Sequence, residues 1–110
     1  MSPSKYRMNF AFCNRNTNIL FDKSLNKTFD AALGKYLNSL RVNAGLSQEY
    51  LGELMGKGQS EIAKIESGNK KINVVDFLHW ISVLNLDLED SLKKLKELTA
   101  FYFEKTKDVD

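Results

Sequence analysis

The stretch from Ser47 to Gly68 constrains the fold most, because its glycines leave room only for short helices. Ser47 is a residue type that caps helix N-termini, and Gly56 stands where the end of such a helix commonly needs a left-handed backbone. The next segment runs from about Gln59 to Ser67 and stops at Gly68. The pattern therefore predicts two helices of about two turns each, joined by a short turn that contains glycine.

The second of these helices has a narrow polar side opposite an apolar one. On a helical wheel, Ile62 and Ile65 point inward. The opposite side carries small or polar residues, which are Gln59, Ser60, Ala63 and Lys64. Gly52 lies in the first helix at a point where a side chain would push the two helices apart. Two such helices form a helix-turn-helix unit, and so narrow a polar side can enter the major groove of DNA, which is about 12 Å wide.

Further helices are predicted on both sides of this unit. A helix capped by Thr28 precedes it, with an apolar face of Phe29, Leu33, Tyr36, Leu37 and Leu40. A helix capped by Asn73 follows, with Asp76 in its first turn. The inward positions predicted for the helices capped by Ser47 and Asn73 are Leu51, Leu54, Met55, Val74, Phe77, Leu78 and Ile81.

The two ends of the chain differ from this central part. Residues 1–27 alternate apolar and polar side chains and then carry an asparagine-rich cluster, which is typical of a β strand or a hairpin. A lone hairpin is marginal in water, so it would need a helix or a second subunit to pack on. Residues 87–110 begin with Asp87 as an N-cap and form a longer helix. We therefore predict an all-α fold of five helices, divided into an arm (1–27), a DNA-binding domain (28–86) and an extended C-terminal helix (87–110).

The region from Phe29 to Leu88 resembles the lambda and Cro-type (XRE) helix-turn-helix family of phage repressors and bacterial regulators. The resemblance rests on Gly-Leu-Ser-Gln from Gly45, on Gln-Ser…Ile…Lys-Ile-Glu-Ser-Gly from Gln59, and on the later Val-Val-Asp-Phe-Leu. It implies a five-helix, lambda-repressor-like domain in which Arg41 and Glu66 form a buried ion pair. Two positions depart from the family pattern: Gly52 replaces the commoner alanine, and Gly58 stands where the recognition helix usually has a serine, threonine or proline cap.

The resemblance also implies a set of DNA contacts. Gln48 and the N-terminus of its helix would hold a phosphate, and Gln59 would contact adenine with two hydrogen bonds. Lys64 would contact guanine or a phosphate, Ser60 a base or the backbone, and Glu61 the amino group of cytosine. The residues expected to neutralise phosphates beside the helix are Lys57, Asn69, Lys70 and Lys71. The alternative for Gln59 and Lys64 is an ordinary solvated surface.

The apolar stripe of the C-terminal helix is longer than a small core needs. A homodimer would bury the excess and would present two recognition helices about 34 Å apart to a palindrome. The residues assigned to this interface are Trp80, Leu88, Leu92, Leu95 and Tyr102. For Trp80 the alternatives are the edge of the core and packing against the C-terminal helix.

Composition excludes several classes of protein. Cys13 and His79 are each the only residue of their type, which excludes an internal disulfide, a multi-cysteine zinc site and a histidine pair that binds metal. The sequence holds no nucleophile–base pair, so we assign no catalytic residue, metal or cofactor and expect no enzyme. No apolar run approaches the length that spans a bilayer, and we expect a cytoplasmic protein without a membrane partner.

The pattern favours a sequence-specific transcriptional regulator that binds double-stranded DNA. We expect a repressor, because occupying a promoter needs no more than the DNA-binding unit. The net charge of +2 is modest, but residues 1–28 hold five basic residues against one acidic residue. The alternative is the antitoxin of a toxin–antitoxin pair, in which the same unit autoregulates its operon and residues 1–27 bind a toxin.

Overall fold

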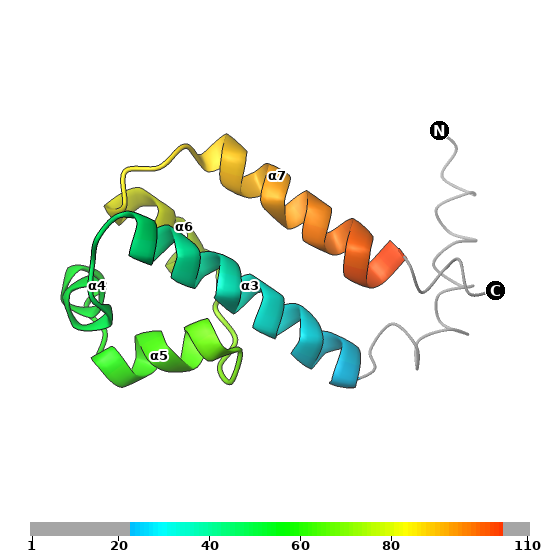
Figure 1. The fold of residues 1–110 in the computed structure, drawn as a ribbon, viewed down its shortest axis with the longest axis horizontal. Coiled ribbons are helices and arrows are strands. Elements are labelled where there is room, and N and C mark those ends of the chain that lie inside the picture. The colour runs from blue at the N-terminus through cyan, green and yellow to red at the C-terminus, as the bar shows by residue number, and fades with distance from the viewer. Residues whose placement is uncertain (1–22, 105–110) are drawn as a thin grey trace.

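A computed structural model describes residues 23–104 of the 110-residue chain, with side chains from 27 to 102. The elements are α3 (Lys23–Asn43), α4 (Gln48–Met55), α5 (Gln59–Ser67), α6 (Val74–Val83), α7 (Leu88–Thr99) and the π-helical turn η1 (Ala100–Glu104). Figure 1 shows α3 running through the molecule between α5 and α7. No strand occurs between residues 23 and 104, and the predicted all-α class is confirmed there. The strand or hairpin predicted for the arm lies outside the described residues.

The first helix is longer than predicted. α3 begins at Lys23, so Thr28 lies inside it and the prediction that Thr28 is its N-cap was wrong. Neither glycine nor proline occurs between these two residues, so nothing in the local sequence ends the helix there. The boundary drawn between residues 27 and 28 therefore falls within a helix.

The N-caps predicted for the other helices and the glycine ends of α4 and α5 are confirmed, whereas the α-helix predicted over 87–110 ends at Thr99 and is followed by η1. Ser47, Asn73 and Asp87 each accept a hydrogen bond from a backbone N–H in the first turn of α4, α6 and α7. Gly56 and Gly68 end α4 and α5 with φ values of 70° and 83°, in the left-handed region that favours glycine. These caps fix the lengths of α4 and α5, and with them the geometry of the turn between the two helices.

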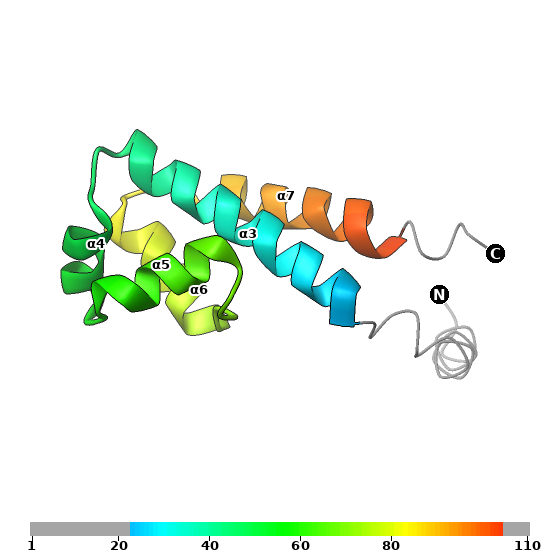
Figure 2. The ribbon, with the colours of Figure 1, turned by 60° about the horizontal axis from the view of Figure 1, so that its bottom comes forward.

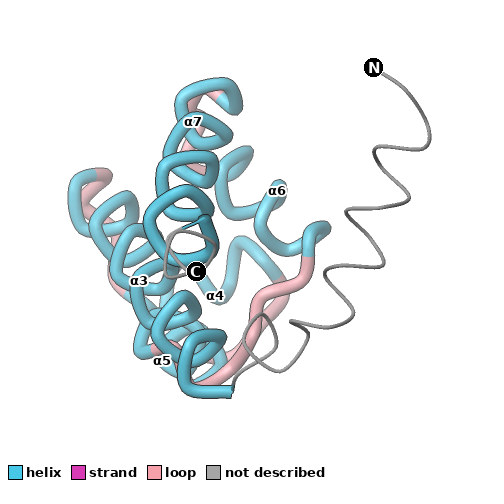
Figure 3. Tube along the Cα trace, turned by 90° about the vertical axis from the view of Figure 1, so that its right-hand side faces the viewer, coloured by secondary structure: helices cyan, strands magenta, loops and turns pink. Residues whose placement is uncertain are grey.

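One core forms between α3, α4, α5 and α6, and Leu95 of α7 packs against it. Its buried apolar residues are Leu37, Leu51, Met55, Ile62, Ile65, Phe77, Trp80, Ile81 and Leu84. In Figure 3, α3 and α5 lie on one side of the molecule and α6 on the other, with α7 at the top. The predictions that Leu54, Val74 and Leu78 point inward were wrong, since their exposed fractions are 41%, 73% and 42%. The wheel gave the direction of each apolar face but not its width, and neighbouring helices cover only a narrow strip of α4 and α6.

The assignment of Trp80 to the dimer interface was wrong. Its side chain is fully buried, so it belongs to the core and has no surface to offer a second subunit. The reason is that α7 packs against both α6 and α3 and closes this side of the domain. The indole Nε1 of Trp80 has no hydrogen-bond partner among the described residues.

The C-terminal helix runs alongside α3 in the opposite direction, as Figures 1 and 2 show. The Tyr36 hydroxyl donates to Ser91 Oγ at 3.3 Å. Near the far end, the rings of Phe29 and Tyr102 meet edge to face, with centroids 6.1 Å apart. Because Leu95 also packs against the core cluster, much of the C-terminal apolar stripe is used within the chain.

A close backbone approach between α3 and α5 depends on Gly34. A Cβ atom added there would overlap the carbonyl oxygens of Ile65 and Glu66 and would lie 2.8 Å from the Glu66 carbonyl carbon. These are backbone atoms in the last turn of α5, so they cannot give way without moving that helix.

We expect Gly34→Ala to destabilise the protein by about 1–3 kcal/mol, because the overlap outweighs the better helix propensity of alanine. Chemical denaturation measures the loss of unfolding free energy. Lys35→Ala, an exposed change on the same helix, is the control and should stay within about 0.5 kcal/mol of the wild type. Equal stability of the two variants would contradict the close approach.

Candidate nucleic-acid interface

The carboxylate of Glu66 anchors the recognition helix α5 to α3. Arg41 Nε donates to Glu66 Oε2 at 2.7 Å, and Arg41 Nη2 donates to Oε1 at 3.1 Å. The two side chains are only 10% and 5% exposed, so the buried ion pair implied by the family resemblance is confirmed. Arg41 Nη1 also donates to the Leu46 carbonyl at 2.6 Å. The pair thus joins α3, the loop before α4 and the end of α5.

Two amide side chains complete the surroundings of this carboxylate. Asn38 Nδ2 and Gln48 Nε2 donate to Glu66 Oε1 at 2.7 and 3.0 Å. Burial by itself would raise the pKa of Glu66, but the hydrogen bonds from Arg41, Asn38 and Gln48 outweigh it and hold the pKa below its usual value of 4.5. The carboxylate is therefore charged at neutral pH.

A hydrogen bond links this buried network to the exposed side of α5. Gln59 Nε2 donates to Gln48 Oε1 at 2.6 Å. Gln48 therefore has one end of its amide on Glu66 and the other on Gln59. Neither this link nor the role of Asn38 was predicted from the sequence. The sequence did indicate that the two glutamines could meet, because Gln48 and Gln59 are the first residues of helices that are joined by one short turn.

The polar side of α5 is open to solvent, as the wheel predicted. Gln59, Ser60 and Lys64 are exposed, whereas Ile62 and Ile65 are buried. Figure 1 shows α5 along the lower edge of the molecule, with α4 beside its first turn. Nothing in the described part of the chain covers this side, so a ligand can approach it.

The lysines beside α5 are engaged with carboxylates. Lys57 Nζ lies 3.1 Å from Glu61 Oε2 and 2.8 Å from Asp76 Oδ2. Lys70 Nζ lies 2.9 Å from the same Glu61 oxygen. Hydrogen bonds to Asp76 and Glu61 raise the pKa of Lys57, and those from Lys70 and Lys57 lower the pKa of Glu61. The structure therefore brings Glu61 together with two of the predicted phosphate contacts.

The remaining predicted contacts are spread around this cluster. Lys71 Nζ lies 2.6 Å from Asp30 Oδ2, which ties the loop after α5 to α3. Asn69 is exposed in the same loop, and its backbone N–H donates to the Lys64 carbonyl at 2.9 Å. Lys64 itself forms no ion pair within the part of the chain that the structure describes.

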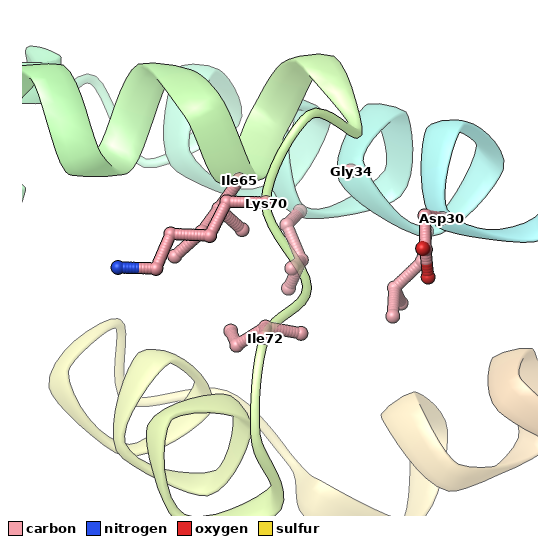
Figure 4. Close-up of a pocket in the computed structure, with 7 residues that line it drawn as sticks. Asp30, Gly34, Ile65, Lys70 and Ile72 are labelled. Carbon is pink, nitrogen blue, oxygen red and sulfur yellow. The ribbon is translucent and has the colours of Figure 1, made fainter. Parts of the chain in front are cut away.

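A small recess lies between α3, the end of α5 and the following loop (Figure 4). Its lining residues are Asp30, Leu33, Gly34, Leu37, Ile65, Lys70 and Ile72. The lining is mainly apolar and backs onto the core, and the Lys70 side chain extends away from Asp30. This is a gap in packing and offers no converging polar groups for a cofactor. Among the described residues, no group of three side chains could hold a metal ion.

Comparison with known proteins agrees with this geometry. Residues 37–90 match the model of a protein family described as Helix-turn-helix. The match runs from the middle of α3 through α4, α5 and α6 to the first turn of α7, so it includes every residue predicted to contact DNA. The matched segment, residues 37–90, is a helix-turn-helix domain of the lambda and Cro type, a family of DNA-binding transcriptional regulators. No curated protein matches the chain. None of the described helices is both long and apolar enough to cross a membrane.

We expect Glu66→Gln to destabilise the protein by about 3–5 kcal/mol at neutral pH, because the amide leaves Arg41 buried without a counter-charge. Chemical denaturation measures the difference. Glu97→Gln on α7, whose side chain is 72% exposed, is the control and should change stability by less than about 0.5 kcal/mol.

The stabilities of the wild type and of Glu66→Gln should also depend differently on pH. Because the folded protein lowers the pKa of Glu66, its contribution is fully present above the usual value near 4.5 and is lost as the pH falls through the lowered folded value. The stability gap between wild type and Glu66→Gln should therefore narrow in acid. A gap that is constant from neutral pH to strong acid would contradict the assignment.

Proposed function

We propose that this DNA-binding regulator is a repressor that occupies a palindromic operator as a homodimer. The observation that carries the proposal is the open polar side of α5, on which Gln59 is held by a hydrogen bond to Gln48. A buried ion pair attaches α5 to the rest of the domain, and its outer side is exposed. Such a helix is suited to the major groove. A promoter covered in this way is blocked without any further activity.

The side-chain amide of Gln59 has hydrogen-bonding atoms left to contact an adenine. Its Nε2 carries two hydrogens, of which one is donated to Gln48. The second hydrogen and the Oε1 atom remain for N7 and N6 of adenine. The fixed amide loses little rotamer freedom on binding, which favours affinity.

The other predicted contacts support the same docking. Gln48 stands at the first position of α4, where backbone N–H groups can hold a phosphate. Lys64 is exposed and free of carboxylates in the described part, so it can reach guanine or a phosphate. The contacts proposed for Ser60 and Asn69 rest on the exposure of both residues beside α5.

The outer side of α7 is our candidate for the dimer interface. Leu88 and Leu92 are 40% and 48% exposed and lie one turn apart. Leu86, just before the helix, adds another apolar side chain that is 40% exposed. Leu95 and Tyr102 are partly buried against the chain itself and can contribute only their remaining surface. Burial of these leucines between two copies would remove apolar area from water.

The antitoxin alternative stays a prediction. Its candidate toxin-binding arm, residues 1–27, lies almost wholly outside the described residues. Co-purification of the product of a neighbouring gene would favour it, because a simple repressor retains no such partner. That the protein is no enzyme and lies in the cytoplasm also stays a prediction.

Two substitutions separate base recognition from phosphate attraction. Gln59→Ala should weaken operator binding by about 1–3 kcal/mol and relax the preference at one base pair. Lys71→Ala should weaken binding to all sequences alike and lower the salt dependence. Binding to the operator and to single-base variants of it, measured by fluorescence anisotropy, distinguishes the two effects. The same loss for every sequence in both variants would contradict the role of Gln59.

Leu92→Lys tests the dimer. A charge in the apolar contact should raise the dimer dissociation constant about tenfold or more, since desolvating lysine is unfavourable. Sedimentation equilibrium gives the constant, and Lys93→Ala, also on an exposed part of α7, should leave it unchanged. A wild-type protein that stays monomeric at tens of micromolar, with no palindromic footprint, would contradict the dimer.

A further inference from the structure

Most lysines at the interface are already paired within the chain. Lys57, Lys70 and Lys71 each have a carboxylate within 3.1 Å, and only Lys64 of the four predicted lysines has none in the described part. A DNA phosphate that approaches these lysines therefore meets competing negative charge. This charge lies on the protein, beside the helix that is to enter the groove.

Glu61 supplies the competing negative charge for two of these lysines. One of its oxygens, Oε2, is 3.1 Å from Lys57 Nζ and 2.9 Å from Lys70 Nζ. An oxygen anion between two ammonium groups occupies the position that a phosphate oxygen would take in a complex. Glu61 comes from the first turn of α5, so the competitor stands on the recognition helix itself.

We propose that Glu61 acts as an internal competitor for the DNA backbone: its carboxylate holds the Lys70 ammonium and so lowers the affinity for any duplex, whatever its sequence. The proposal rests on the proposed function, because it assumes that α5 docks on DNA. It assigns Glu61 a different role from the cytosine contact expected from the sequence.

Lys70 is the cation on which Glu61 acts. Its side chain is 49% exposed, and Glu61 is its one carboxylate partner in the described part. Lys57, by contrast, is 15% exposed and also holds Asp76 of α6, so it keeps a partner if Glu61 is neutralised. Loss of the Glu61 charge therefore frees one accessible lysine beside the groove.

The consequence is a lower non-specific affinity. Non-specific binding comes almost entirely from phosphate contacts and falls steeply with salt, whereas base contacts are unaffected by a competitor at the backbone. A repressor must find its operator among a great excess of other sequences, and a weaker hold on these favours release from them.

The test uses the full-length chain, a short duplex of scrambled sequence and a series of salt concentrations. We expect Glu61→Gln to bind this duplex about two- to tenfold more tightly at low salt. The slope of log affinity against log salt should steepen by up to about one unit, as one more phosphate is neutralised. Glu97→Gln on α7 has the same change in net charge, also beside a lysine, and should bind like the wild type.

A double variant tests whether Glu61 affects DNA binding through Lys70. In a Lys70→Ala background, Glu61→Gln should add less than about twofold to the affinity. An undiminished gain there, an equal gain from Glu97→Gln, or no gain from Glu61→Gln would each overturn the proposal. Weaker binding of Glu61→Gln confined to sequences with one particular cytosine would overturn it in favour of base contact. Failure of the wild type to bind any duplex would instead contradict the proposed function. Thermal unfolding checks that each variant is folded.

Discussion

The buried carboxylate of Glu66 is the group on which the rest of the structure depends. It is the last but one residue of α5, and its donors come from α3 and from the start of α4. An ionised group that is so deeply buried is stable only when it is paired and hydrogen-bonded. The same hydrogen bonds hold each donor side chain in position. The packing at Gly34 acts together with it, because both fix the last turn of α5 against α3. The orientation of α5 is thus set by contacts at its C-terminal end.

The same network reaches the surface that DNA would contact. From Glu66 the hydrogen bonds pass through Gln48 to Gln59, so stability and recognition share a connected set of side chains. Around this neutral amide path stand ion pairs that hold the flanking lysines close to the protein. The proposed interface therefore combines a hydrogen-bonded centre, suited to base edges, with a rim whose positive charge is partly neutralised. This division agrees with the small net charge of the chain.

Local signals predicted much of this fold from the sequence. Caps such as Ser47 and Gly56 act through the nearest backbone atoms, so residue type and spacing suffice to place them. The Arg41–Glu66 pair was implied by the family resemblance, and the structure contains it. The assignment of Trp80 to a dimer interface was wrong, and the alternative of core packing holds, because its burial depends on how α7 packs over α6, which no helical wheel contains. The ion pair of Glu61 with Lys70 was missed because it depends on the path of the loop after α5, whereas the pair with Lys57 has the local i,i+4 spacing and could have been predicted.

A titration of the labelled protein with duplex DNA, followed by the chemical shifts of its backbone amides, tests the central claim most directly. If the open side of α5 enters the groove, the largest changes will fall on Gln48, on the first turns of α5 and on the loop at Asn69. The α7 amides will change little at low protein concentration. Changes confined to α7 and the outer side of α6, with α5 unaffected, would contradict the docking of the recognition helix.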